Sequence, residues 1–249
     1  MEALESRCLF YNSYPSIALQ MRDWINRDRA SPVVACARVN VDLNYENPPN
    51  YLAPTPKPAL IWNEKLVSAA SGWADWLLDH DIMTHGWGDS NPTTRVLAED
   101  NRYFYIMENA GYITTPEYSD INLLSNVASH LHDAFVAHAG HRDQMFAEST
   151  REIGISIKTG DWSGVSVMVA VIEMGTKTPA LGDTNNDRKI DSIDFNIFTS
   201  HYGEHNALPP FNERVTVTFP WEVGDFDSSG MIDTTDFNIL ASNFGKEIL

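Results

Sequence analysis

The chain has 249 residues, with 34 acidic against 17 basic side chains, and its formal net charge at pH 7 is −17. Recognition of nucleic-acid phosphates needs a basic face, so this charge excludes nucleic acid as an expected partner. The longest apolar run, residues 165–172, is interrupted by Ser166 and is far too short to cross a bilayer, so no membrane span is predicted. The length suits one domain of ordinary size followed by a small module.

Residues 1–16 are predicted to be an N-terminal extension. The first twenty residues lack the basic start and the apolar stretch of roughly 7–15 residues that mark a secretion signal, so no such signal is visible. Two cysteines, Cys8 and Cys36, are too few to indicate an oxidising compartment, and whether they pair stays open.

Residues 17–175 are predicted to form one mixed α and β domain. Apolar spacing predicts a helix over 17–26 that ends before Pro32, a second helix from an Asn63 cap to Asp79, and a third over about 120–138. Alternating apolar residues predict strands at 152–158 and 164–174, joined by a turn at 161–164.

The chemistry of this domain is expected to lie with its histidines. Six of the eight fall between residues 80 and 141, and Glu108 and Asp133 lie in the same stretch. Imidazoles together with carboxylates make either a site for a borderline metal ion or a general acid–base site. The chain has no His-Glu-x-x-His helix and no Gly-x-Ser-x-Gly motif, which argues against the common zinc-protease and serine-hydrolase sites.

Several short motifs follow one another along the domain. They are Trp24-Ile25-Asn26-Arg27-Asp28-Arg29, Pro58-Ala59-Leu60-Ile61-Trp62-Asn63, Met83-Thr84-His85, Pro92-Thr93-Thr94-Arg95, Met107-Glu108-Asn109-Ala110, Gly140-His141-Arg142 and Glu152-Ile153-Gly154-Ile155. In this order they resemble a bacterial CAP domain, from the superfamily of cysteine-rich secretory, antigen 5 and pathogenesis-related proteins, over roughly residues 17–175. The resemblance implies an α/β/α sandwich with a central cleft, so the fold class expected for this domain is α+β.

CAP clefts carry two histidines and usually two acids, and some bind zinc or another divalent cation. By motif, His85 and His141 match the histidines and Glu108 matches the acid of the Glu-Asn pair, while Asp133 is the nearest candidate for the second acid. These four are the candidate catalytic residues. The two imidazoles are also the candidate ligands for Zn²⁺ or another divalent ion, with water in the remaining positions. The chain departs from the family where the usual Thr-Gln pair is replaced within residues 169–173.

The C-terminal quarter of the chain contains a repeat. Residues 182–197 return 42 residues later as 224–239, with oxygen-bearing side chains at loop positions 1, 3, 5, 9 and 12. That spacing wraps one calcium ion, with position 7 contributing its backbone carbonyl. The predicted ligands are Asp183, Asn185, Asp187, Lys189, Asp191 and Asp194 in the first loop, and Asp225, Asp227, Ser229, Met231, Asp233 and Asp236 in the second.

The two loops differ at position 6. It favours glycine because the chain turns there with φ > 0; Gly230 complies and Arg188 does not. A non-glycine residue in this conformation costs roughly 1–2 kcal/mol, so loop 183–194 is predicted to bind calcium more weakly. At position 8, Ile190 and Ile232 are expected to point into a small core while their backbones pair with the partner loop.

A short helix is predicted after each loop, stopped by Gly203 and by Gly245. Two such loop–helix halves, over 182–249 after a 176–181 linker, resemble a dockerin, the calcium-dependent α-helical module that docks secreted enzymes onto cohesin domains. A cohesin-like protein or a cell-surface partner is therefore implied, and Thr234-Thr235 matches the hydroxyl pair of dockerins. The spacer between Gly203 and Asp225 is longer than a dockerin linker usually is. The alternative is a pair of acidic turns that hold no metal.

Three functions compete at this point. The first is a secreted, extracellular bacterial binding protein, whose cleft holds an ion or a small ligand and whose tail docks to a partner when two calcium ions are bound. The second is a metal-dependent hydrolase that acts on peptide or cell-wall polysaccharide material through His85, Glu108 and His141. The third is a structural calcium module beside a degenerate cleft.

Overall fold

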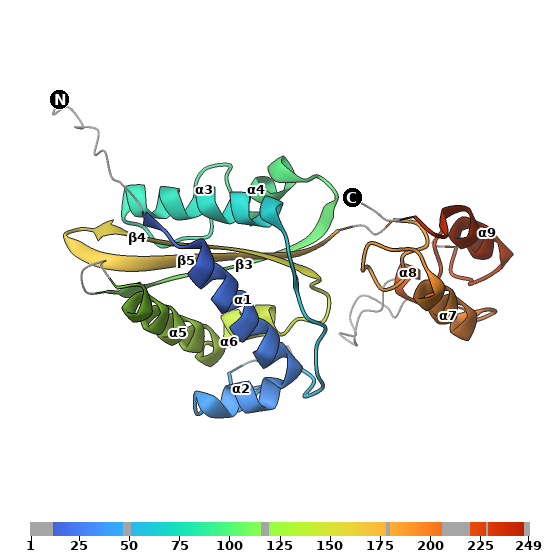
Figure 1. Ribbon diagram of the computed structural model, residues 1–249, viewed down its shortest axis with the longest axis horizontal. Helices are drawn as coiled ribbons and strands as arrows, with labels where there is room; N and C mark the ends of the chain where they lie inside the picture. Colours follow the sequence, from blue (N-terminus) through green and yellow to red (C-terminus); the bar gives the residue numbers. More distant parts are fainter. Residues whose placement is uncertain are drawn as a thin grey trace. The chain divides into compact units, whose positions relative to one another are not determined.

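The computed structural model describes residues 12–46, 51–115, 120–177, 180–205, 220–227 and 229–246 (Figure 1). The chain divides into two compact units, residues 1–176 and 177–249, which we call the N-terminal and C-terminal units. Most of the predicted extension, Cys8, Pro179 of the predicted linker and residues 206–219 of the spacer lie outside the described residues.

A long antiparallel hairpin forms the middle of the N-terminal unit. β4 (Glu152–Trp162) and β5 (Val165–Lys177) pair without interruption from Glu152↔Gly175 to Trp162↔Val165. The turn needs only Ser163 and Gly164, whose φ angles of 51° and 85° are the positive pair that a two-residue hairpin requires. The sheet order is β1 (Asn12–Ser13), β4, β5, β3 (Tyr103–Thr114), and β2 (Ile61–Trp62) runs parallel to the start of β4.

One face of the sheet is covered by α1 (Pro15–Ala30), α2 (Pro32–Arg38), α5 (Ile121–Ala137) and α6 (Ala139–Met145) (Figure 1). Their apolar sides enclose Ile155 and Ile157 of β4 and Met168 and Ile172 of β5 in the largest core. Pro32 was predicted to end a helix, and it also begins one. It occupies the first turn of α2, where its missing N–H leaves no hydrogen bond unmade.

The opposite face is covered by α3 (Glu64–His80) and α4 (Pro92–Glu99). Asn63 caps α3, its Oδ1 accepting from the Lys65 N–H, as the sequence predicted. Trp73 and Leu77 of α3 pack with Val169 and Val171 of β5 in a second core. Helices therefore sandwich the sheet, which confirms the expected α+β layering.

The C-terminal unit is built from two matching loop–helix repeats. α7 (Ser192–His201) and α9 (Thr234–Asn243) each follow one acidic loop, and the four-residue α8 (Pro220–Val223) precedes the second loop. Phe198, Phe226, Ile232 and Leu240 form a small core. The predicted stops, Gly203 and Gly245, have φ angles of 86° and 80°, as expected for glycines that end helices.

The repeats are joined through backbone hydrogen bonds that cross between them. The Ile190 N–H donates to the Lys246 carbonyl, and the Gly245 N–H donates to the Ile190 carbonyl. In the other repeat, the Ile232 N–H donates to the Glu204 carbonyl, and the Gly203 N–H donates to the Ile232 carbonyl. The expectation that position 8 pairs with the partner loop is therefore wrong: it pairs with the residues after the partner helix.

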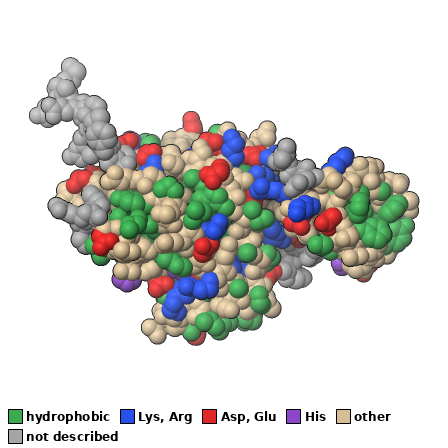
Figure 2. All heavy atoms as spheres, in the orientation of Figure 1, with side chains coloured by type: hydrophobic (Ala, Val, Ile, Leu, Met, Phe, Trp, Pro, Cys, Tyr) green, Lys and Arg blue, Asp and Glu red, His purple; other side chains and the backbone are tan. Residues whose placement is uncertain are grey.

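Apolar side chains gather on the visible face of the C-terminal unit (Figure 2). Within this unit the large apolar residues that remain exposed include Ile193, Phe195, Phe237 and Phe244. Among the described residues, none of the helices combines the length and the apolarity that crossing a bilayer demands.

Candidate functional site

His85 and Glu108 form the centre of the candidate site. His85 lies in the loop after α3, and Glu108 lies on β3, where its side chain is buried. Nδ1 of His85 and Oε1 of Glu108 are 2.7 Å apart. An ionised carboxylate has no hydrogen to donate, so Nδ1 carries the hydrogen and Nε2 of the half-exposed ring is left for another partner. The hydrogen bond that His85 donates to Glu108 raises the pKa of His85 above its ordinary value.

Arg95 of α4 holds this pair in place. Its Nη2 donates to Oε2 of Glu108, and both terminal nitrogens donate weakly to the carbonyl of His85, at 3.4 and 3.3 Å. The guanidinium lies over the ring of Trp73, 3.9 Å from the centroid, and Trp73 Nε1 donates to the Thr84 carbonyl at 3.0 Å. Guanidinium–indole stacking of this kind limits the rotamers open to the arginine.

His141 joins the same neighbourhood from α6. Its carbonyl accepts a hydrogen bond of 3.1 Å from Asn109, the residue after Glu108, which ties α6 to β3. Burial lowers the pKa of His141 to about 4, with further repulsion from His138 and His85, so its ring is neutral at pH 7. The structure thus brings His85, Glu108 and His141 together. We call these three residues, with Arg95 and Glu173, the histidine–glutamate cluster.

The predicted second acid, Asp133, does not belong to this cluster. Its carboxylate forms an ion pair of 2.9 Å with Arg38 and lies near His132. These residues belong to α2 and α5, which cover the face of the sheet opposite α3 and α4. The acid that accompanies Glu108 is Glu173 of β5, which is fully buried and lies 3.7 Å from Arg95 Nη2. Sequence reasoning marked residues 169–173 as a departure from the family, and this was the signal that could have identified Glu173.

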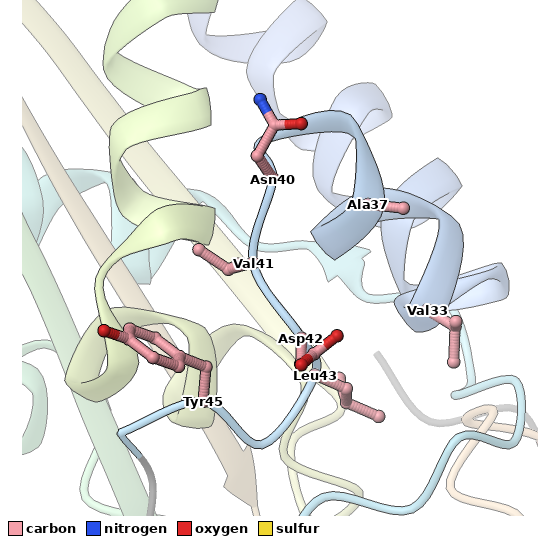
Figure 3. Close-up of a pocket in the computed structure, with 7 residues that line it drawn as sticks. All are labelled: Val33, Ala37, Asn40, Val41, Asp42, Leu43 and Tyr45. Carbon is pink, nitrogen blue, oxygen red and sulfur yellow. The ribbon is translucent and has the colours of Figure 1, made fainter.

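An open hollow of about 520 Å³ lies between α2 and the loop that follows it (Figure 3). Its lining is about equally polar and apolar, with Asn40, Asp42 and Tyr45 supplying polar groups. None of its lining residues belongs to the histidine–glutamate cluster, and we assign it no role.

The second acidic loop gathers its carboxylates around one point. Ligand atoms of Asp225, Asp227 and Asp236 all lie within 4.8 Å of one another, a group of three that, across the described part of the chain, recurs nowhere else. Oδ1 and Oδ2 of Asp225 accept hydrogen bonds from the Ser229 and Gly230 N–H groups, and Asp236 accepts from Phe226 and Asp233. The loop is therefore held in shape by its own backbone.

The first loop repeats these bonds with different residues. Asp183 accepts from the N–H groups of Asp187 and Arg188, and Asp194 accepts from Thr184 and Asp191. Arg188 has the strained φ of 72° that the sequence predicted for position 6. Asn185 donates from Nδ2 to Asp187, 3.0 Å away, so two predicted ligands face each other.

The predicted ligands at position 9 also cap the helices that follow the two loops. Asp191 and Asp233 are the N-caps of α7 and α9, where they accept from the Ile193 and Thr235 N–H groups. A side chain in this position reaches a calcium ion through a water molecule in loops of this type. The carbonyls of Lys189 and Met231 remain the candidates at position 7, and the Met231 carbonyl already accepts from the hydroxyl of Ser229, at 3.2 Å.

The donor sets fit the two kinds of ion differently. Carboxylate, hydroxyl and carbonyl oxygens, as in the loops, are the ligands that Ca²⁺ takes. The neutral imidazole of His141 and Nε2 of His85 are the kind of nitrogen ligands that zinc takes. Glu108 would orient the imidazole of His85 without itself being a ligand.

Comparison with known families identifies the N-terminal unit. Residues 23–172 match the family described as CAP, the cysteine-rich secretory protein family. This protein belongs to the CAP family. The matched residues run from within α1 to within β5 and include His85, Arg95, Glu108 and His141, while Glu173 lies one residue beyond them. We call the N-terminal unit, residues 1–176, the CAP unit. A search of curated protein sequences finds no match to the chain.

Solved structures that match part of this chain include bacterial surface and extracellular proteins. An outer surface protein from Borrelia burgdorferi is 12% identical and has a TM-score of 0.41, with 68% of this chain matched to 100% of that one. An extracellular SCP-domain protein from Bacillus anthracis is 14% identical, has a TM-score of 0.40 and matches 66% of this chain and 41% of its own. A cysteine-rich secretory protein from Staphylococcus aureus is 13% identical, with a TM-score of 0.35 and coverage of 71% and 41%.

Proposed function

We propose that this protein is a secreted bacterial binding protein. In this proposal its CAP unit holds a divalent cation or a small ligand at the histidine–glutamate cluster, and its C-terminal unit is a dockerin-like module that docks to a partner when calcium is bound. The observation that carries the proposal is the convergence of Asp225, Asp227 and Asp236, in a loop whose sequence and hydrogen bonds recur 42 residues upstream.

Calcium binding is tested directly by titration calorimetry on the calcium-stripped full chain. Two ions per chain are expected. Asp225→Ala combined with Asp236→Ala removes the second site, and Asp183→Ala combined with Asp194→Ala removes the first. Asp89→Ala, an exposed acid outside the loops, is the control and leaves both sites intact. A wild-type chain that takes up no calcium would contradict the proposal.

Docking is the purpose we assign to the calcium. Metal binding and folding are linked in such modules, so calcium is expected to raise the unfolding temperature of the C-terminal unit. The exposed apolar residues of α7 and α9 and the hydroxyls of Thr234 and Thr235 offer a surface to a cohesin-like or cell-surface protein. The test is calcium-dependent binding to an immobilised cohesin domain, with a chelator as the negative control.

Metal binding at the CAP unit is tested with zinc while calcium saturates the loops. The supporting observations are that His141 is neutral and close enough to His85 for their charges to interact, and that Nδ1 of His85 is bound to Glu108, which leaves Nε2 for a ligand. Because each imidazole supplies one of two protein ligands, His85→Ala or His141→Ala is expected to weaken zinc binding at least tenfold. His130→Ala, on the exposed side of α5, is the matched control. Equal affinities in all four proteins would exclude this site.

Hydrolysis is the second candidate function. The feature that favours it is the buried Glu108 beside a half-exposed imidazole, a pairing that general acid–base catalysis uses. Turnover in a panel of peptide and cell-wall substrates that is lost in His85→Ala and His141→Ala would establish it. Turnover that survives both changes would place catalysis elsewhere.

A further inference from the structure

Glu173 is the least solvated acid of the histidine–glutamate cluster. It lies on β5 with no exposed surface, and within the described ranges neither carboxyl oxygen accepts a hydrogen bond from an N–H group or a hydroxyl. Its partner across the sheet on β4 is Gly154, which has no side chain. The charged groups that act on it are Glu108 of β3 and Arg95 of α4.

Arg95 does not neutralise Glu173. Its Nη2 already donates to Glu108 and lies 3.7 Å from Glu173, beyond hydrogen-bonding distance. One guanidinium therefore faces two buried carboxyl groups. An ionised carboxylate that is buried without hydrogen bonds is destabilised by several kcal/mol, and two carboxyls that share one site do not both ionise at neutral pH.

We propose that Glu173 is protonated at neutral pH and donates this proton in a hydrogen bond to the carboxylate of Glu108. Glu108 then accepts from three donors: Glu173, His85 and Arg95. Glu173 is a positioning residue, because it acts on the exposed imidazole only through Glu108. Glu173 has this role whether or not a metal ion binds at the histidines.

The electrostatics of the cluster agree with this arrangement. Burial raises the pKa of Glu173 well above its ordinary value, and the neighbouring carboxyl of Glu108 raises it further. A protonated acid supplies an O–H donor where the structure otherwise leaves two buried oxygens facing a carboxylate. No proton leaves the pair in this state; the hydrogen remains covalently bound to Glu173.

The test is Glu173→Gln in the full chain, since glutamine has the shape and donor capacity of the protonated acid but does not titrate. A group whose folded-state pKa is raised contributes stability that is fully present below its unfolded pKa, 4.5 for Glu173, and is lost as pH rises to the folded pKa. The folding constant of Glu173→Gln relative to the wild type is therefore expected to rise by up to about tenfold per pH unit over that window. Urea unfolding followed by tryptophan fluorescence measures it, because six of the seven tryptophans lie in the CAP unit.

A ratio that stays flat from about pH 5 to about pH 8 overturns the proposal, because it means that Glu173 is already ionised over that range. Infrared spectroscopy provides a second test that needs no variant at Glu173. The carbonyl band of a protonated carboxylic acid is expected at neutral pH in D₂O. Because burial raises the pKa of Asp183 to about 7, the spectrum is recorded on Asp183→Asn, where absence of the band overturns the proposal.

Discussion

At the scale of single residues, the buried His132 contributes to the response of the CAP unit to acid, as does His141 with a similarly lowered pKa. His132 lies on α5 with 2% of its surface exposed, between Asp28 of α1 and Asp133, with Arg38 of α2 beside them. Burial lowers the pKa of His132 to about 4, although the attraction of Asp28 opposes that shift. The imidazole is therefore neutral in the folded protein at pH 7, while in the unfolded chain it titrates near 6.5.

The CAP unit is expected to lose stability as pH falls from about 6.5 to about 4, because in that window the unfolded chain binds a proton that the folded one does not. The loss attributable to His132 is roughly 3 kcal/mol. His132→Phe, which keeps a ring in this space, should remove most of that loss. Urea unfolding at a series of pH values measures it, with His130→Phe on the exposed side of α5 as control. Equal acid sensitivity in His132→Phe and the wild type would contradict the assignment.

Individual residues also show how far the sequence could lead to the site. His85, Glu108 and His141 were predicted from short motifs, and the structure brings them together. Asp133 was chosen by nearness in sequence, but its position on α5 directs it to Arg38. Glu173 lies on β5, and the local sequence does not show that β5 pairs with β3, the strand that carries Glu108. The approach of Glu173 to Glu108 therefore depends on the tertiary fold.

At the scale of elements, the close contact between α3 and β4 depends on Gly154. A Cβ at this position would lie 2.2 Å from the Val67 nitrogen and 2.4 Å from the Leu66 carbonyl carbon. Both are backbone atoms, so a side chain can be accommodated only if the whole helix moves away from the sheet. Residue 154 therefore controls the packing of one helical layer.

Gly154→Ala is expected to destabilise the CAP unit by about 3 kcal/mol, because the helix cannot keep its present distance from β4. Gly72→Ala provides the matched control within α3 itself. A Cβ at Gly72 meets nothing within 4 Å, and alanine favours the helix by up to about 1 kcal/mol, so this variant should be slightly stabilised. Chemical denaturation of both variants gives the comparison. A Gly154→Ala variant as stable as Gly72→Ala would show that α3 shifts freely.

Elements with a clear period were predicted well, and those without one were missed. α3 and α5 carry apolar residues at helical spacing and were located almost to their ends. β3, from Tyr103 to Thr114, was not predicted, because its buried residues follow no simple alternation. α4 and α6 are only 8 and 7 residues long, too short for periodicity to distinguish them from loops.

At the scale of the whole molecule, the crossed backbone bonds of the C-terminal unit couple its two loops. Ile190 of the first loop is anchored to Gly245 and Lys246 behind α9, and Ile232 of the second is anchored to Gly203 and Glu204 behind α7. An ion bound in one loop would therefore also order the segment that closes the other repeat. For the proposed calcium sites, these hydrogen bonds predict positive cooperativity between the two loops.

Loss of the second site through Asp225→Ala and Asp236→Ala is expected to weaken calcium binding at the first by about fivefold or more. Because coupling is reciprocal, loss of the first site should weaken the second by the same factor. Calorimetry on the two loop variants, compared with the wild-type chain, supplies both numbers. If each loop binds calcium with the same affinity in the wild type as in the variant that lacks the other site, the crossed hydrogen bonds do not couple the two loops.

The position of the central hairpin along the chain affects the order in which the CAP unit can fold. β4 and β5 form the middle of the sheet, but they are the last part of the unit to be synthesised. Their mutual contacts are local and can form quickly once both strands exist. Before that moment α1, α3 and α5 have no sheet to cover, so on the ribosome their apolar faces meet water or chaperones until the hairpin emerges and condenses with them.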